Sequence, residues 1–235
     1  MKAQDNQVPP EAEKFLQSAE FVDSNSREVQ DFTARALGGL AVTASDTEKT
    51  IRLFEAVRDG LKYDPYRVSL EPNAYRASTI AKGAAGYCVP KAILLTACLR
   101  AAGVPAALGF ADVRNHLNTP KLTELMGTDL FIYHGYVQVW LEGESYKITP
   151  AFNMELCERF GVKPLVFDGT SDALFHEFNE QDEQHMEYVN DRGLFLDVPI
   201  DGFLRDFRAA YPNMVAHIER GESPNTKDAF TIEEQ

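Results

Sequence analysis

One stretch organises this chain: Gly86-Tyr87-Cys88-Val89-Pro90, followed by an apolar run that ends at Gly103. Proline is tolerated in the first turn of a helix because the N–H that it lacks would have no partner there, and the residue before proline is driven away from helical geometry. We therefore predict a helix that begins near Pro90, with Cys88 just outside it. The free N–H groups and the positive dipole end of a helix start favour an anion. This placement predicts a Cys88 thiol with a lowered pKa, ready to act as a nucleophile.

The other two cysteines lack this setting. Free cysteine usually behaves as a small buried hydrophobe, and we assign that structural role to Cys98 and Cys157. An odd number of cysteines without Cys-x-x-Cys spacing argues against a disulfide framework and against a zinc site. We expect reduced thiols, no metal and no other cofactor.

Length and charge limit the functional classes. The chain has 235 residues, 44% of them hydrophobic, which is enough for one sizeable domain. We predict a helical extension over residues 1–44, a catalytic domain over 45–211 and a polar, acidic, poorly ordered tail over 212–235. A net charge of −13 weighs against a nucleic-acid partner, which would need clustered Lys and Arg. The absence of a long apolar run or a signal-peptide pattern predicts a cytoplasmic protein that contacts no membrane.

Periodicity and capping residues predict an α+β chain, with helices first and strands later. The expected helices cover 9–16, 27–37 after the cap Ser26, 46–60 after a capping box at Ser45, 78–83, 90–103, 154–160 after the cap Asn153, and 201–210 capped by Asp201. The expected strands are 104–113 and two hairpins, 131–141 with 146–149 and 186–189 with 194–198. A long polar loop is expected from Arg114 to Asp129. The cysteine helix should pack on the antiparallel sheet.

A cysteine nucleophile needs a base, and histidine has the suitable pKa. His134 lies in a predicted strand of aromatic and β-branched residues, where a structural core role is the ordinary alternative. His116, in the long loop, is its rival. The other three histidines, His176, His185 and His217, lie in polar or terminal segments.

The order of these parts resembles the transglutaminase-like superfamily of papain-type cysteine enzymes. The resemblance covers about residues 45–155, and three segments carry it: Gly86-Tyr87-Cys88, Leu94 to Gly109, and His134 to Leu141. It implies a papain-like fold in which Cys88 is the nucleophile and His134 is the general base.

The third catalytic position departs from the family pattern. Members usually carry Asp-Pro on the strand after the histidine strand, and here the matching pair is Thr149-Pro150. A threonine hydroxyl cannot stabilise an imidazolium as a carboxylate would. Asn153 could orient the ring through its amide oxygen, or it could serve only as a helix cap. Asp112 and Asp129 are more distant possibilities.

The resemblance implies acyl transfer or amide hydrolysis through a thioester on Cys88. The oxyanion donors would be the Cys88 N–H and one more group, for which Tyr63 and Tyr87 are candidates. The expected substrates are a protein, a peptide, or a small amide or thioester. Calcium-dependent crosslinking has no support, because no EF-hand-like loop is present. Two alternatives stay open: an acyltransferase or cyclase acting on carrier-bound thioesters, and a binding scaffold with impaired catalysis.

Overall fold

The computed structural model describes residues 10–115, 118–174 and 186–222. Its elements, in chain order, are η1 (Glu13–Leu16), α1 (Arg27–Ala36), α2 (Asp46–Gly60), β1 (Lys62–Tyr63), η2 (Pro72–Tyr75), α3 (Ala77–Ile80), β2 (Ala85–Gly86), α4 (Cys88–Ala101), β3 (Ala106–Asn115), α5 (Pro120–Met126), β4 (Leu130–Leu141), β5 (Glu144–Ile148), α6 (Met154–Phe160), β6 (Met186–Phe195), α7 (Ile200–Ala210) and α8 (Pro212–Glu219). The predicted α+β class is confirmed.

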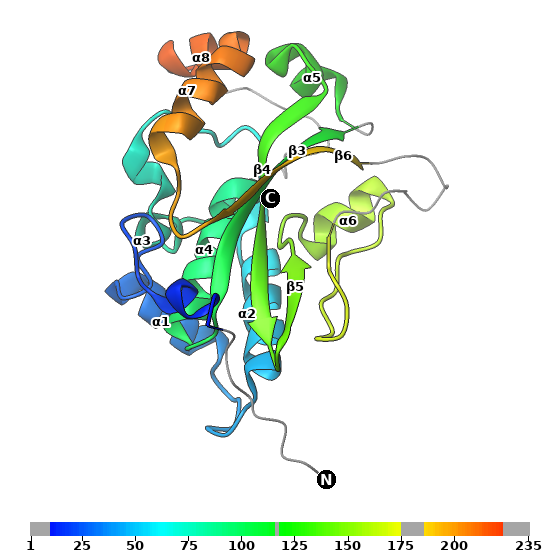
Figure 1. Ribbon diagram of the computed structural model, residues 1–235. Helices are drawn as coiled ribbons and strands as arrows, with labels where there is room; N and C mark the ends of the chain where they lie inside the picture. Colours follow the sequence, from blue (N-terminus) through cyan, green and yellow to red (C-terminus); the bar gives the residue numbers. More distant parts are fainter. Residues whose placement is uncertain (1–9, 116–117, 175–185, 223–235) are drawn as a thin grey trace.

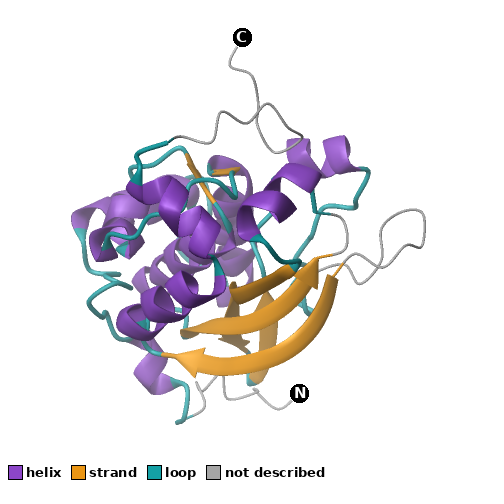
Figure 2. Ribbon diagram, turned by 90° about the horizontal axis from the view of Figure 1, so that it is seen from above, coloured by secondary structure: helices purple, strands orange, loops and turns teal. Residues whose placement is uncertain are grey.

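A curved antiparallel sheet forms one layer of the molecule, with strand order β5-β4-β3-β6. Strands β4 and β5 form the predicted hairpin, in which Val137 pairs with Ile148. Helices gather on one face of this sheet, and α4 and α2 lie directly behind it (Figures 1 and 2). The cysteine helix therefore packs on the sheet as expected.

The second predicted hairpin is wrong. Residues 186–195 form one strand, β6, which pairs antiparallel with β3 along its whole length. Gly193 adopts a φ of +91° inside this strand, so the turn-like Asn190-Asp191-Arg192-Gly193 sequence produces an irregularity in the pairing and no reversal of the chain. A long-range partner strand thus overrides the local turn signal.

Two segments expected to lack regular structure are helical. The long polar loop contains α5, whose start is capped by the Thr119 hydroxyl accepting from Leu122 N–H at 3.3 Å, and which ends at Gly127 in the left-handed region. Residues 212–219, assigned to a poorly ordered tail, form α8, and Met214 is buried there. Figure 1 shows α5, α7 and α8 together at one end of the sheet.

The predicted helix starts are mostly correct. The Ser45 capping box is present with both reciprocal hydrogen bonds. Asp201, however, lies in the first turn of α7, and Pro199 occupies the cap position. The domain boundaries at residues 45 and 211 stay predictions.

Helix α4 is the centre of the core, and all its residues from Cys88 to Arg100 are buried. A helix that is apolar all round is expected in such a place. Lys91 has a polar side chain, yet it is fully buried in this helix. Its Nζ donates to the carbonyls of Arg58 and Leu61, at 2.7 and 2.6 Å. It therefore ties α4 to the end of α2, immediately before β1.

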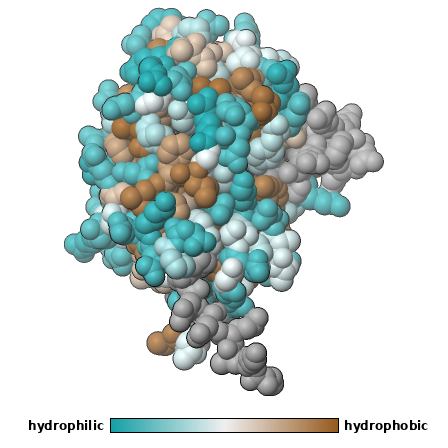
Figure 3. Space-filling model, in the orientation of Figure 1, coloured by the Kyte–Doolittle hydropathy of each residue, from teal (hydrophilic) through white to brown (hydrophobic). Residues whose placement is uncertain are grey.

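Hydrophilic residues cover most of the face seen in Figure 3, with smaller apolar patches between them. None of the helices that the structure describes is long and apolar enough to cross a bilayer.

Candidate active site

Cys88 is the first residue of α4, two residues earlier than the start that the sequence predicts at Pro90. Tyr87, in extended geometry, holds the cap position, and its carbonyl accepts the first helical hydrogen bond from Lys91 N–H at 3.2 Å. The N–H groups of Cys88 and Val89 therefore precede the helical ladder. Pro90 lies within the first turn, where its missing N–H costs nothing. The predicted helix start is thus present, and it lies at Cys88 instead of Pro90.

Gly135 brings strand β4 against this helix start. A Cβ at Gly135 would lie 3.0 Å from Val89 Cα, 3.1 Å from Ala92 Cβ and 3.1 Å from the Cys88 carbonyl oxygen. Contacts this short are tighter than nearly all real Cβ contacts, so a side chain at 135 would push the strand and the helix start apart by a few tenths of an ångström. Since Gly135 directly follows His134, the same approach carries the histidine to the cysteine end of α4.

Burial, and not the helix dipole, dominates the acidity of both groups. It raises the pKa of the Cys88 thiol to about 12, and hydrogen bonds from the backbone N–H groups of Gly135, Val89 and Cys88 itself only partly oppose it. Burial likewise lowers the pKa of His134 to about 3. The predicted lowered pKa of Cys88 is therefore wrong. At neutral pH the two groups are a thiol and a neutral imidazole.

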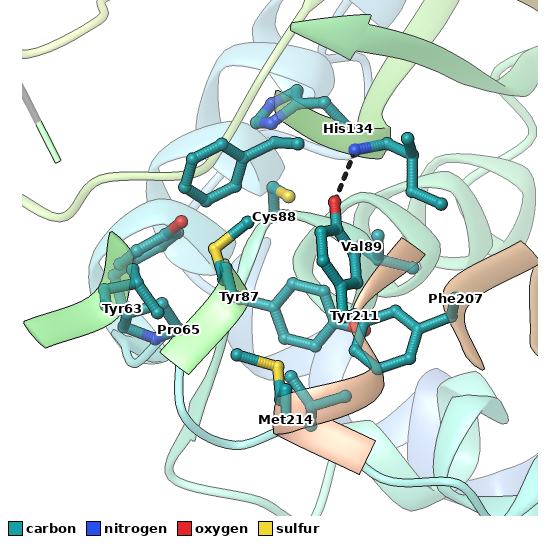
Figure 4. A pocket seen from close by; sticks show the side chains of 14 residues that line it. Tyr63, Pro65, Tyr87, Cys88, Val89, His134, Phe207, Tyr211 and Met214 are labelled. Carbon is teal, nitrogen blue, oxygen red and sulfur yellow. Dashed lines mark hydrogen bonds between the residues drawn. The ribbon is translucent and has the colours of Figure 1, made fainter. Parts of the chain in front are cut away.

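Cys88 and His134 line one pocket, whose space is about 450 Å³ with the open solvent at its mouth included (Figure 4). Figure 4 shows both side chains toward one end of this pocket, with Met214 at the other. Cys88 is 6% exposed and His134 is 3% exposed. The structure thus brings the two principal predicted residues to one cavity.

The two candidate tyrosines also line this pocket. Strand β1 pairs in parallel with β2, which places Tyr63 opposite Gly86, two residues before Cys88. Burial, together with the negative charge that Cys88 and Asp64 could carry, holds the pKa of Tyr63 well above its usual range. The Tyr87 hydroxyl lies 3.0 Å from that of Tyr75. Tyr87 therefore has an internal hydrogen-bond partner.

Asn153 and Thr149, the candidates for the third catalytic position, differ in their hydrogen bonds. Asn153 precedes α6 as its cap residue, yet its side chain makes no capping bond, and its Oδ1 instead accepts from Tyr63 N–H at 3.1 Å. Thr149 is fully buried, and its hydroxyl has no hydrogen-bond partner in residues 10–115, 118–174 and 186–222. Asn153 thus fixes the strand that carries Tyr63.

Asp112 binds the backbone of Tyr133, the residue before His134. Its carboxylate accepts from Tyr133 N–H at 3.0 Å and from Arg192 Nε at 2.6 Å. Tyr133 has a φ of +56°, a left-handed conformation that is unusual for an aromatic residue. The Arg192 guanidinium lies 4.0 Å from the Tyr133 ring, and the Tyr133 hydroxyl donates to Asp206 at 3.0 Å. This network holds the strained residue immediately before His134.

The remaining sequence candidates lie elsewhere. Asp129 forms a half-exposed ion pair with Arg114 at 3.4 Å. His217 lies on α8 and pairs with Glu222 at 2.9 Å. His116, His176 and His185 fall outside the described residues. Within the described ranges, no three His, Cys, Asp or Glu side chains converge as metal ligands.

Sequence reasoning missed a whole wall of the pocket. Leu122 and Met126 on α5 belong to this wall. So do Phe207 on α7, Met214 on α8, and Tyr211, the residue between those two helices. A signal was present in both segments, since these residues recur at spacings of three and four, which is typical of one apolar helix face. The polar, acidic residues that follow the second segment, from Glu222 onward, outweighed it in the sequence reading.

Comparisons with known proteins give one family match and two similar solved structures. Residues 34–148 match the family model of the Transglutaminase-like superfamily. Among solved structures, a putative cysteine protease from Cytophaga hutchinsonii is similar at 15% identity with a TM-score of 0.45, over 61% of this chain and 43% of that chain. A putative protease from Parabacteroides distasonis is similar at 19% identity with a TM-score of 0.36, over 58% of this chain and 25% of that chain.

This chain thus spans less than half of the length of either structure, and at these scores neither likeness bears on its activity. No curated protein matches it. The matched segment runs from α1 to the end of β5 and contains both Cys88 and His134. Residues 34–148, just under half of the chain, thus match the transglutaminase-like superfamily.

Proposed function

We propose that this protein is a cysteine-dependent acyl-transfer enzyme that forms a thioester on Cys88, with His134 as general base. One observation carries the proposal: the residue at the start of α4 and the histidine on β4 line the same pocket. Glycine at position 135 supports it, because a larger residue there would separate the two elements.

The proposed reaction has two steps. In the first, the Cys88 sulfur bonds to the substrate's carbonyl carbon while its proton passes to His134, and that proton then leaves with the amine or thiol of the broken bond. In the second, water or an amine attacks the thioester and restores the Cys88 thiol. Because burial disfavours both charged forms, we expect proton transfer to accompany sulfur attack, without a resting ion pair.

The oxyanion would form close to the start of α4. The N–H groups of Cys88 and Val89 precede the helical ladder, and backbone donors of this kind stabilise a developing negative charge. Tyr63 and Tyr87, which both line the pocket, are the side-chain candidates for the second donor. We assign the substrate to the amides and thioesters, including peptides and carrier-bound acyl groups, and place the reaction in a reducing compartment such as the cytoplasm.

A binding scaffold with impaired catalysis is the second candidate. The specific observation in its favour is Thr149, a fully buried hydroxyl where the family usually has a carboxylate. A scaffold would bind the ligand without modifying Cys88.

The test is acylation by hexanoyl-N-acetylcysteamine, a simple thioester, followed by intact mass and peptide mapping. We expect one hexanoyl group on the peptide that contains Cys88, in the parent protein and in Cys98→Ser, and no adduct in Cys88→Ser. His134→Gln should slow the acylation at least about 100-fold, within the usual range for general-base catalysis. An adduct that persists in Cys88→Ser, or no adduct in the parent protein, would contradict the proposal.

A further inference from the structure

The walls of the pocket are almost wholly apolar. Apart from Cys88 and His134, every described residue that lines it is aliphatic, aromatic, proline or methionine. No charged or amide side chain belongs to this set. A charged or strongly hydrated substrate group would lose its water here and gain no partner, which is costly.

The hydroxyls of Tyr87 and Tyr211 do not change this character; Tyr63, the third tyrosine of the lining, is a candidate oxyanion donor. Tyr211 accepts from Ile132 N–H at 2.7 Å and donates to the Leu130 carbonyl at 3.0 Å (Figure 4). The Tyr87 hydroxyl meets that of Tyr75, which also donates to the Ser69 carbonyl. With these polar groups engaged inside the protein, the rings present their apolar surface to the cavity.

The pocket extends beyond the reacting sulfur: Figure 4 shows Met214 at the end opposite Cys88 and His134. Val68, Tyr87, Phe131 and Ile132 are its partly exposed lining residues, whereas Met126, Phe207 and Met214 are buried. These buried side chains come from α5, α7 and α8 and form one wall of the pocket.

We infer that the substrate is an apolar, uncharged acyl compound, whose carbonyl lies at Cys88 and whose aliphatic or aromatic chain packs between α5 and helices α7 and α8. The inference rests on the proposed function and names its substrate class. Helices α7 and α8 lie beyond the segment that matches the family, so they supply specificity that the shared core does not contain.

The experiment compares N-acetylcysteamine thioesters of acetyl, butyryl, hexanoyl, octanoyl and adipoyl groups. Adipoyl has the six carbons of hexanoyl and ends in a carboxylate, so that pair isolates charge at constant length. We expect the rate of Cys88 acylation to rise about 10- to 200-fold from acetyl to hexanoyl, as burial of four methylenes allows. Adipoyl should react at least about tenfold more slowly than hexanoyl, because its charge enters an apolar pocket.

Two matched variants test the wall itself. Met214→Ala shortens the wall and should raise the octanoyl-to-hexanoyl rate ratio at least about threefold, the value of roughly one buried methylene. Met154→Ala changes the same residue type on α6, outside the pocket and 41% exposed, and should leave the ratio unchanged. Melting temperatures of both variants confirm that they fold.

The outcomes are distinguishable. Equal acylation of Cys88 by all five thioesters, adipoyl included, would overturn the substrate class and leave the proposed nucleophile standing. Equal ratios in the two methionine variants would overturn the assignment of α8 to the wall. Acylation by none of them would overturn the proposed function, and the substrate class with it.

Discussion

The Asp112 carboxylate accepts a hydrogen bond of 3.0 Å from the backbone N–H of Tyr133, the residue immediately before His134. Tyr133 is one of two non-glycine residues with positive φ in the described ranges. A strained backbone persists only where its surroundings determine it, and such positions cluster at functional sites. Asp112, on β3, thus sets the backbone that presents the candidate base on β4.

Replacing Asp112 tests this positioning role. Asp112→Ala removes the acceptor for Tyr133 N–H, and we expect it to lower stability by about 1–3 kcal/mol and to slow Cys88 acylation at least about tenfold. Asp112→Asn keeps an oxygen at the same place and should recover most of the rate. Thioester acylation and urea unfolding, measured on both variants, decide the matter. Equal rates in the two variants would show that the hydrogen bond to Tyr133 N–H has no part in positioning.

The close approach at Gly135 gives a second prediction. Gly135→Ala forces a methyl group against the backbone at the start of α4, which should cost about 1–3 kcal/mol of stability, as overpacking does. The displaced helix start should also reduce the acylation rate of Cys88. Gly60→Ala is the matched control, since a Cβ there has nothing within 4 Å. If Gly135→Ala kept the parent rate, the contact would have no functional weight.

The buried His134 predicts an acid-sensitive fold. Its pKa falls from 6.5 to about 3 on folding, so below pH 6.5 the unfolded chain binds a proton that the native state does not. Stability from this group is full above pH 6.5 and falls with decreasing pH. We expect a loss of about 2 kcal/mol between pH 7 and pH 5. Urea unfolding at both values, compared with His134→Gln, measures it, and an undiminished pH dependence in the variant would point to other groups.

Thiol alkylation should separate the three cysteines. Cys88 lines the pocket, whereas Cys98 is fully buried and Cys157 is 2% exposed on α6. N-ethylmaleimide, a small uncharged reagent, should therefore modify Cys88 first. Because the pKa of Cys88 is about 12, the rate should keep rising with pH to at least pH 9, without a plateau at acidic pH. Peptide mapping over time gives the order, and such a plateau would reveal a thiolate–imidazolium pair.

Thr149→Asp restores the family's usual acid. If position 149 faces the imidazole, the carboxylate should raise the pKa of His134 from its low value and increase the acylation rate. The rate-versus-pH profile reports both effects, and Thr149→Val serves as the uncharged control. A slower, unstable Thr149→Asp protein would place the third group elsewhere.

How far the sequence predicts this molecule depends on the range of the interactions involved. The capping box at Ser45 and the β4–β5 hairpin follow from neighbouring residues, and the sequence predicts both; it also predicts the start of α4 to within two residues, at Pro90 instead of Cys88. Strand β6 was misread because its partner, β3, lies more than 70 residues away. A local turn signal carries no information about such a partner.

The candidate site divides in the same way. Sequence alone selected Cys88 and His134 as candidates for the chemistry, since a thiol at a helix start and a histidine in a strand are local patterns. Tertiary structure decided their protonation state. Burial by segments far apart in the chain lowers the pKa of His134 and raises that of Cys88, for which it outweighs the effect of the helix start. Tertiary structure also decided the partners of these residues: the Asn153 side chain accepts from Tyr63 N–H, and the Asp112 carboxylate accepts from Tyr133 N–H. It placed residues of α7 and α8 in the pocket wall. Desolvation and packing depend on which distant surfaces meet, and only the folded chain brings those surfaces together.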